Sequence, residues 1–94
     1  MGPEARIERA IRQEAIRAGW VVRKLAFPGT RGAPDRIFGK GGRAVLIEFK
    51  SAHGCSSVQQ VRRFRELREV FGFEVWLCAS VERGREILGL NGGV

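Results

Sequence analysis

Apolar residues recur at intervals of three and four along three stretches of the chain, the spacing that turns one face of a helix toward a core. The first stretch, residues 4–18, carries Ile7, Ala10, Ile11, Ala15 and Ile16 in one stripe. The second, residues 57–71, carries Val58, Val61, Phe64, Leu67 and Phe71. Gly19 and Gly72 are predicted to end these two helices, because glycine commonly follows the last helical turn. A shorter helix is predicted over residues 81–89, with Ser80 as its N-cap.

Four further stretches have the composition of β-strands, namely residues 20–27, 34–39, 43–50 and 73–79. The Gly-Lys-Gly-Gly sequence at 39–42 predicts a hairpin turn between the second and third of them. The helix between the third and fourth is a long crossover, so these two strands are predicted to run parallel. The order is α-β-β-β-α-β-α, and we expect one α/β domain over residues 1–94, with helices packed on a mixed sheet.

Strand 43–50 departs from its own pattern at one end. Both of its faces are apolar in the middle, which predicts a central strand buried on both sides. One face nevertheless ends in Glu48 and Lys50, and charges there are costly unless they are paired or bind an ion. A plain salt bridge is the alternative, because the Glu-x-Lys tripeptide is common and unspecific.

Asp35 changes the interpretation of this strand end. It opens strand 34–39, and in an antiparallel hairpin the start of one strand lies beside the end of the other, so Asp35 and Glu48 are expected to be neighbours. Two carboxylates that close repel each other unless a divalent cation lies between them. Oxygen ligands favour Mg²⁺ or Mn²⁺, and such an ion with Lys50 nearby suits phosphodiester hydrolysis. The alternative is that Asp35 only caps the Pro-Asp turn.

The charge of the chain indicates a polyanionic partner, nucleic acid first. Seventeen basic and ten acidic residues give a formal net charge of +7, and only three of the basic residues are lysine. Arginine suits bidentate contact with phosphate, although a soluble domain that is simply basic is the alternative. There is no long apolar run, no signal segment, and only two cysteines, without zinc-type spacing. We therefore expect an intracellular protein with free thiols and no membrane contact.

Pro34-Asp35 followed by Glu48-Phe49-Lys50 resembles the signature of PD-(D/E)xK nucleases. The surrounding sequence is similar to that of the virus-type replication–repair nuclease (VRR-NUC) family over residues 27–36, 45–50, 56–59 and 72–75. The resemblance covers roughly residues 4–80 and implies a restriction-endonuclease-like α-β-β-β-α-β core, in agreement with the order above.

The resemblance also implies roles for the matching residues. Asp35 and Glu48 would bind the metal together with the main-chain carbonyl of Phe49, and Lys50 would be the catalytic lysine. Family members place a further glutamate from the first helix in the active site, where it would contribute to catalysis and to metal binding. Glu4 fits that opening pattern best here.

Other positions of the resemblance are more open. Glu8, one turn beyond Glu4, is the alternative first-helix glutamate, and either residue is equally compatible with a solvated helix charge. Gln59 matches a helix glutamine that lies close to the site in the family and would act in catalysis; the alternative is a surface glutamine. Cys55 stands where relatives often carry a basic residue.

Short stand-alone members of the family resemble phage-type proteins and Holliday-junction resolvases, which act as homodimers. The resemblance therefore implies an endonuclease for branched or structured DNA, above all four-way junctions, that acts as a homodimer. A non-catalytic DNA-binding module, a flap or non-specific nuclease, and a basic structural protein are the alternatives, and RNA stays open as a substrate. The predicted DNA contacts are Lys24, Thr30, Arg31, Gly32, Arg36, Arg62 and Arg63, with Arg65 and Arg68 in the same basic run.

Overall fold

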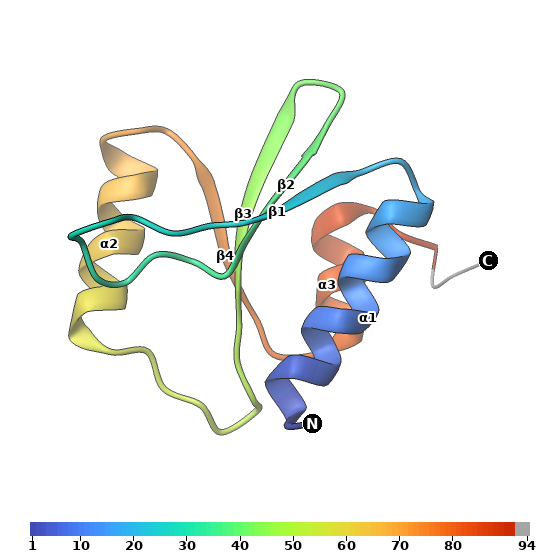
Figure 1. The fold of residues 1–94 in the computed structure, drawn as a ribbon, viewed down its shortest axis with the longest axis horizontal. Coiled ribbons are helices and arrows are strands. Elements are labelled where there is room, and N and C mark those ends of the chain that lie inside the picture. The colour runs from blue at the N-terminus through green and yellow to red at the C-terminus, as the bar shows by residue number, and fades with distance from the viewer. Residues whose placement is uncertain (92–94) are drawn as a thin grey trace.

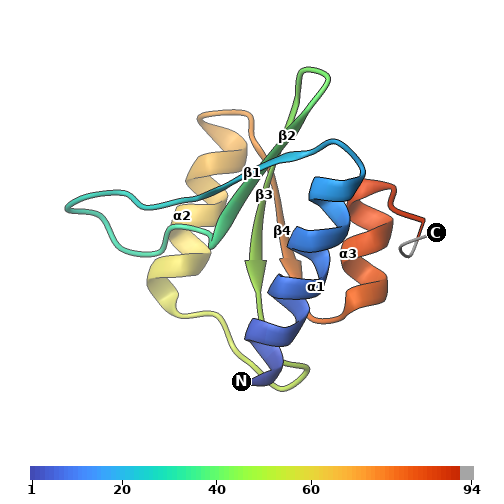
Figure 2. The ribbon, with the colours of Figure 1, turned by 45° about the vertical axis from the view of Figure 1, so that its right-hand side comes forward.

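A computed structural model describes residues 1–91 of the chain and has seven elements in the predicted order. They are α1 (Pro3–Arg17), β1 (Val21–Lys24), β2 (Arg36–Lys40), β3 (Arg43–Phe49), α2 (Val58–Glu69), β4 (Glu74–Cys78) and α3 (Val81–Leu88). Helices α1 and α3 lie side by side on one face of the sheet, and α2 covers the opposite face (Figures 1 and 2). Within the described residues, no helix combines the length and apolarity needed to cross a membrane.

The four strands form one sheet in the order β1-β2-β3-β4. The first two neighbouring pairs are antiparallel, whereas β3 and β4 run parallel, as the helical crossover between them predicts. This mixed sheet with helices on both faces confirms the predicted α/β class and the predicted position of the hairpin.

Strand β3 is the centre of the core and is buried on both faces, as predicted. Val45, Ile47 and Phe49 belong to the cluster that packs under α1 and α3. Leu46, which points the other way, packs with Phe64 and Leu67 of α2. Burial of each such side chain contributes about 1.5–3 kcal/mol to the free energy of folding, so β3 holds the residues at its ends in fixed positions.

Helices α1 and α3 are joined by packing and by a buried charge. A Cβ at Gly84 would lie 2.5 Å from Cγ1 of Ile11, so this glycine permits the close approach of the two helices. Glu14 accepts two hydrogen bonds from the Arg85 guanidinium, at 3.0 and 2.9 Å. Those bonds hold the pKa of Glu14 below its ordinary value, because they stabilise the charged form. The pair holds α1 and α3 together on their face of the sheet.

The first strand is shorter than predicted. Instead of residues 20–27, β1 ends at Lys24, whose partner Arg36 is the first residue of β2. With no further β2 residue to pair, the chain leaves the sheet as a loop over residues 25–35 that extends toward α2 (Figures 1 and 2). The amide of Leu25 donates to the carbonyl of Asp35 at 3.1 Å, which holds the two ends of this loop together.

The predicted apolar stripes are wider than the buried ones. Ile16, Val58, Val61 and Phe71 are exposed by 52, 64, 51 and 62% respectively. In α2 only Phe64 and Leu67 reach the core, because one helix covers this face of a narrow sheet and turns its other sides to solvent. Phe71 lies beyond the end of α2 at Glu69, so helical spacing no longer sets its direction.

Candidate active site

The hairpin brings Asp35 to the end of β3. Arg36 pairs with Ile47 across the β2–β3 ladder, so one step further Asp35 comes opposite Glu48, as the sequence predicts. Oδ2 of Asp35 accepts a hydrogen bond from the Phe49 amide at 2.8 Å. This bond fixes the Asp35 carboxylate at the open end of the central strand.

Glu48 is a buried carboxylate, with only 6% of the residue exposed. Its Oε2 accepts a hydrogen bond from Nε2 of Gln60 at 2.8 Å and lies 3.4 Å from Nζ of Lys50. Burial raises the pKa of Glu48, and the nearby charge of Asp35 raises it further, against the opposing effects of Gln60 and Lys50. The structure therefore contains both the salt bridge and the carboxylate pair that the sequence leaves as alternatives.

The oxygen atoms at this point suit a hard divalent cation. Neither Oδ1 of Asp35 nor Oε1 of Glu48 accepts a hydrogen bond from any residue in the range 1–91. The N–H and C=O of one strand residue point to the same side, so the Phe49 carbonyl is directed toward Asp35 and away from β4. Over the described part of the chain no three His, Cys, Asp or Glu side chains gather as a cage. Mg²⁺ does not require one, because it is commonly held by one or two carboxylates and keeps several waters.

Both first-helix glutamates lie at this site. Glu4 and Glu8 line a hollow of about 220 Å³ together with Asp35, Phe49 and others. Glu8 pairs with Arg36 at 2.9 Å and with Arg12 at 3.2 Å, so its charge is already compensated. Glu4 is exposed and its Oε1 lies 3.4 Å from the Ser51 amide. Of the two, Glu4 therefore has the carboxylate that is more available to an ion.

The glutamine beside the carboxylates is Gln60, and the expected placement of Gln59 there is wrong. Gln59 is exposed, whereas the Gln60 side chain reaches Glu48. Gln60 lies four and seven positions before Phe64 and Leu67, the two buried residues of α2, and so shares their face. That spacing is a signal in the sequence that would have identified Gln60, whereas similarity to the family motif favoured its neighbour.

Gly32 has a packing role in the loop. Its φ is +93°, and a Cβ there would lie 2.7 Å from the main-chain oxygen of Gln59. The loop therefore rests directly on the first turn of α2, and Nε of Arg63 adds a hydrogen bond to the Arg31 carbonyl at 3.1 Å. These contacts hold in place the segment that leads into Asp35.

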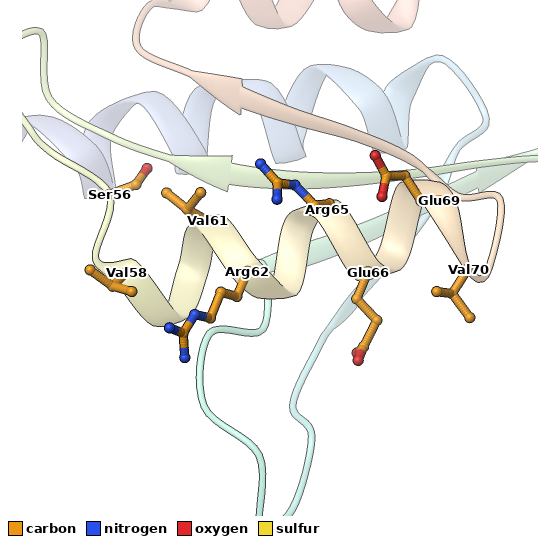
Figure 3. A pocket seen from close by; sticks show the side chains of 8 residues that line it. All are labelled: Ser56, Val58, Val61, Arg62, Arg65, Glu66, Glu69 and Val70. Atoms are coloured by element: carbon orange, nitrogen blue, oxygen red, sulfur yellow. The ribbon is translucent and has the colours of Figure 1, made fainter.

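The predicted basic run on α2 is divided by the structure. Arg63 pairs with Glu66 at 2.6 Å, and Arg68 donates to the Val75 carbonyl at 2.8 Å. Figure 3 shows the outward face of α2, where Arg62 and Arg65 alternate with acidic side chains and valines. This face is of mixed charge, and it is not a continuous basic track.

The other predicted contact residues lie on or near the loop. Lys24 and Arg36 line the hollow beside Asp35, although Arg36 is engaged by Glu8. Thr30 and Arg31 are exposed at the outer part of the loop. Lys24, Thr30 and Arg31 are thus the predicted contacts that lie nearest to the carboxylates along the chain and remain accessible.

Gln60 and Gln59 provide a matched pair for testing the corrected site. Gln60→Ala removes a donor to Glu48 and is expected to lower any metal-dependent cleavage by about tenfold, the cost of one lost hydrogen bond to a charged group. Gln59→Ala, one residue away and exposed, is expected to change the rate less than about twofold. Initial rates on one substrate measure both, and equal losses would contradict the assignment of Gln60.

The raised pKa of Glu48 predicts a pH effect on stability. The folded state binds the proton of the Glu48 carboxyl more tightly than the unfolded state does. The protonated carboxyl therefore adds to the free energy of unfolding, fully below its ordinary pKa of 4.5, and this addition is lost as the pH rises through the raised pKa. The glutamine of Glu48→Gln cannot ionise. The free energy of unfolding of this variant should therefore increase relative to that of the wild type as the pH rises above about 4.5. Urea unfolding in EDTA from acid to neutral pH tests this, and parallel curves would refute it.

The fold and the candidate site together define a class of protein. Its members have an α-β-β-β-α-β core, and the central strand of the sheet ends beside two carboxylates and a lysine. Among solved structures, one titled "VRR_NUC domain" superimposes with a TM-score of 0.84, covering 95% of this chain and 97% of that chain at 23% sequence identity. The predicted resemblance is thereby confirmed at the level of the fold. No family model matches the chain, and no curated protein matches it.

Proposed function

We propose that this protein is a metal-dependent nuclease that hydrolyses phosphodiester bonds in DNA. The observation that carries the proposal is the placement of Asp35 beside Glu48, one of them buried with a raised pKa, at the end of a rigid strand. A buried carboxylate beside a second, exposed one is unfavourable for folding alone and becomes favourable when a cation is bound. The net charge of +7 supports nucleic acid as the substrate.

The residues that would hold Mg²⁺ or Mn²⁺ are Asp35, Glu48 and the Phe49 carbonyl, with Glu4 at the rim of the hollow. A bound ion would lower the pKa of a water ligand and offset negative charge on the phosphate. Lys50, held 3.4 Å from Glu48, would orient the attacking water or donate a hydrogen bond to the phosphate. Gln60 would keep the Glu48 carboxylate in its orientation.

We further propose that the nuclease is an endonuclease for branched or structured DNA, above all four-way junctions, and that it acts as a homodimer. The seven elements of residues 1–91 all belong to one α/β fold, so branch recognition by these residues would use the surface of that fold itself. Two copies would supply two active sites at a fixed spacing, which suits paired cuts in a junction.

The deciding experiment is a panel of labelled substrates comprising linear duplex, flap, splayed arm, four-way junction and single-stranded RNA. Each is incubated with Mg²⁺, with Mn²⁺ and with EDTA, and light scattering gives the mass of the protein in solution. We expect junctions to be cut best, with no cutting in EDTA. Equal cutting of all DNA forms would remove the junction preference, and a monomer would remove the dimer. Salt-dependent binding without cleavage under any ion would identify a non-catalytic DNA-binding module.

A further inference from the structure

A second cavity lies between the loop over residues 25–35 and the C-terminal half of α2. It has a volume of about 350 Å³ and is lined by Phe27, Thr30, Arg63, Glu66, Leu67, Phe71 and Phe73. That volume is in the range of roughly 300–1,000 Å³ found for small-ligand pockets. The mechanism above makes no use of this aromatic cavity.

Two of its phenylalanines are unusually exposed. Phe71 is 62% and Phe73 36% exposed, and their ring centroids are 6.5 Å apart with an angle of 35° between the planes. Burial in the core does not account for Phe71, because its side chain faces solvent. Adjoining exposed apolar side chains rimmed by polar ones are typical of interaction sites. The rings form an open platform next to the cavity.

The aromatic cavity is physically joined to the candidate active site by the loop. Phe27 and Thr30 belong to residues 25–35, and the same segment ends at Asp35. Arg63 lines the cavity and also binds the Arg31 carbonyl, while Gly32 is seated on the first turn of α2. A strand that passes the carboxylates along this loop would therefore bring its neighbouring nucleotides to the cavity.

The chemistry of the lining favours a nucleobase over a phosphate. Arg63 and Glu66 compensate each other at 2.6 Å, so the cavity offers no surplus positive charge to an anion. Flat aromatic rings instead stack on bases, and this interaction tolerates any sequence because every base has a π-face. The surplus charge that attracts the sugar–phosphate backbone lies elsewhere in this chain of net charge +7, with Arg31 exposed on the adjoining loop.

We propose that the aromatic cavity binds an unpaired base of the nucleic acid strand that occupies the active site, by stacking on Phe71 and Phe73. The proposal rests on the proposed function only in taking nucleic acid as the ligand. It explains how a small domain would favour branched or frayed DNA over continuous duplex, because a base inside a duplex is not free to stack on protein.

Binding without cleavage tests the proposal separately from nuclease activity. In EDTA, affinities for a fluorescein-labelled oligothymidine strand and for a matched duplex are measured by anisotropy. Phe71→Ala with Phe73→Ala is expected to weaken single-strand binding by about tenfold, the typical effect of losing a stacked base, and duplex binding by less than about twofold. Val70→Ala, a neighbouring exposed residue outside the cavity, is the matched control and should change neither affinity.

Conservative variants keep the test independent of folding. Phe71→Trp should retain single-strand affinity and show quenching of its fluorescence by the oligothymidine, whereas Phe71→Leu keeps an apolar side chain but should lose affinity. Unchanged single-strand affinity in the alanine variant, or equal losses for strand and duplex, would overturn the proposal. So would a fall in the mass of the protein without a selective loss, since the cavity would then be an interface between two copies. Absence of cleavage with Mg²⁺ would refute the nuclease function, but the binding measurement in EDTA could still be interpreted.

Discussion

Asp35→Asn, Glu48→Gln and Lys50→Ala are each expected to reduce DNA cleavage by at least about 100-fold, the effect typical of removing one group that stabilises charge in a transition state. Asp35→Asn and Glu48→Gln would each remove one of the two negative charges that attract the ion, although the new amide has nearly the same shape as the carboxylate. Lys50→Ala would remove the only ammonium that the described residues place against Glu48. Initial rates on the best substrate of the panel give the size of each loss.

The controls separate lost chemistry from lost folding. Glu82→Gln changes an exposed glutamate of α3 in the same way and should cut like the wild type. Circular dichroism should show Asp35→Asn and Glu48→Gln folded, since these carboxylate-to-amide changes relieve repulsion in the site. The same measurement checks the fold of Lys50→Ala. Because the three groups would act as a unit, a double variant should lose little more than the worse single variant. Normal cutting by Asp35→Asn or Glu48→Gln would refute the site.

Divalent ions are expected to stabilise the wild type strongly and to be required for cleavage. At a hundredfold excess over its dissociation constant, an ion that binds only the folded state adds about 2.7 kcal/mol to the free energy of unfolding. In a domain of this size that raises the melting temperature by on the order of 10 °C. EDTA should abolish both the stabilisation and the cleavage. Thermal melts with Mg²⁺ and Mn²⁺ measure the effect without a substrate.

The same melts locate the ion. The variant that combines Asp35→Asn and Glu48→Gln should show little of the shift, whereas Glu82→Gln should show all of it. Glu4→Gln and Glu8→Gln distinguish the two first-helix candidates, because Glu8 is already paired with Arg12 and Arg36. We expect the larger loss of shift for Glu4→Gln. An equal shift in the wild type and the double variant would place the ion elsewhere on the chain.

Much of the fold and the centre of the site were predictable from the chain because they depend on local or short-range patterns. Periodicities of two and of three to four gave the order of the elements, and the crossover helix gave the parallel pair β3–β4. The glycine-rich turn set the register of β2 and β3, and that register places Asp35 opposite Glu48. A hairpin is local in sequence, so its geometry can be derived without knowing the rest of the fold.

Tertiary packing decided what the periodic pattern leaves open. Which turn of α2 faces the sheet determines that Gln60, and not Gln59, contacts Glu48. The same packing leaves Phe71 on the surface although it continues an apolar stripe. Pairing between distant segments engages Glu8 with Arg36 and Arg63 with the Arg31 carbonyl, and no spacing along the chain encodes such partners.

The sequence by itself therefore determined the class of fold, the hairpin, and the trio of Asp35, Glu48 and Lys50, because strand register and side-chain alternation are properties of a short segment. Only the tertiary structure decided which neighbours complete that trio, which arginines are already paired, and where the aromatic cavity opens. These features depend on how α1 and α2 are seated against the sheet, and that seating follows from the burial of many side chains at once.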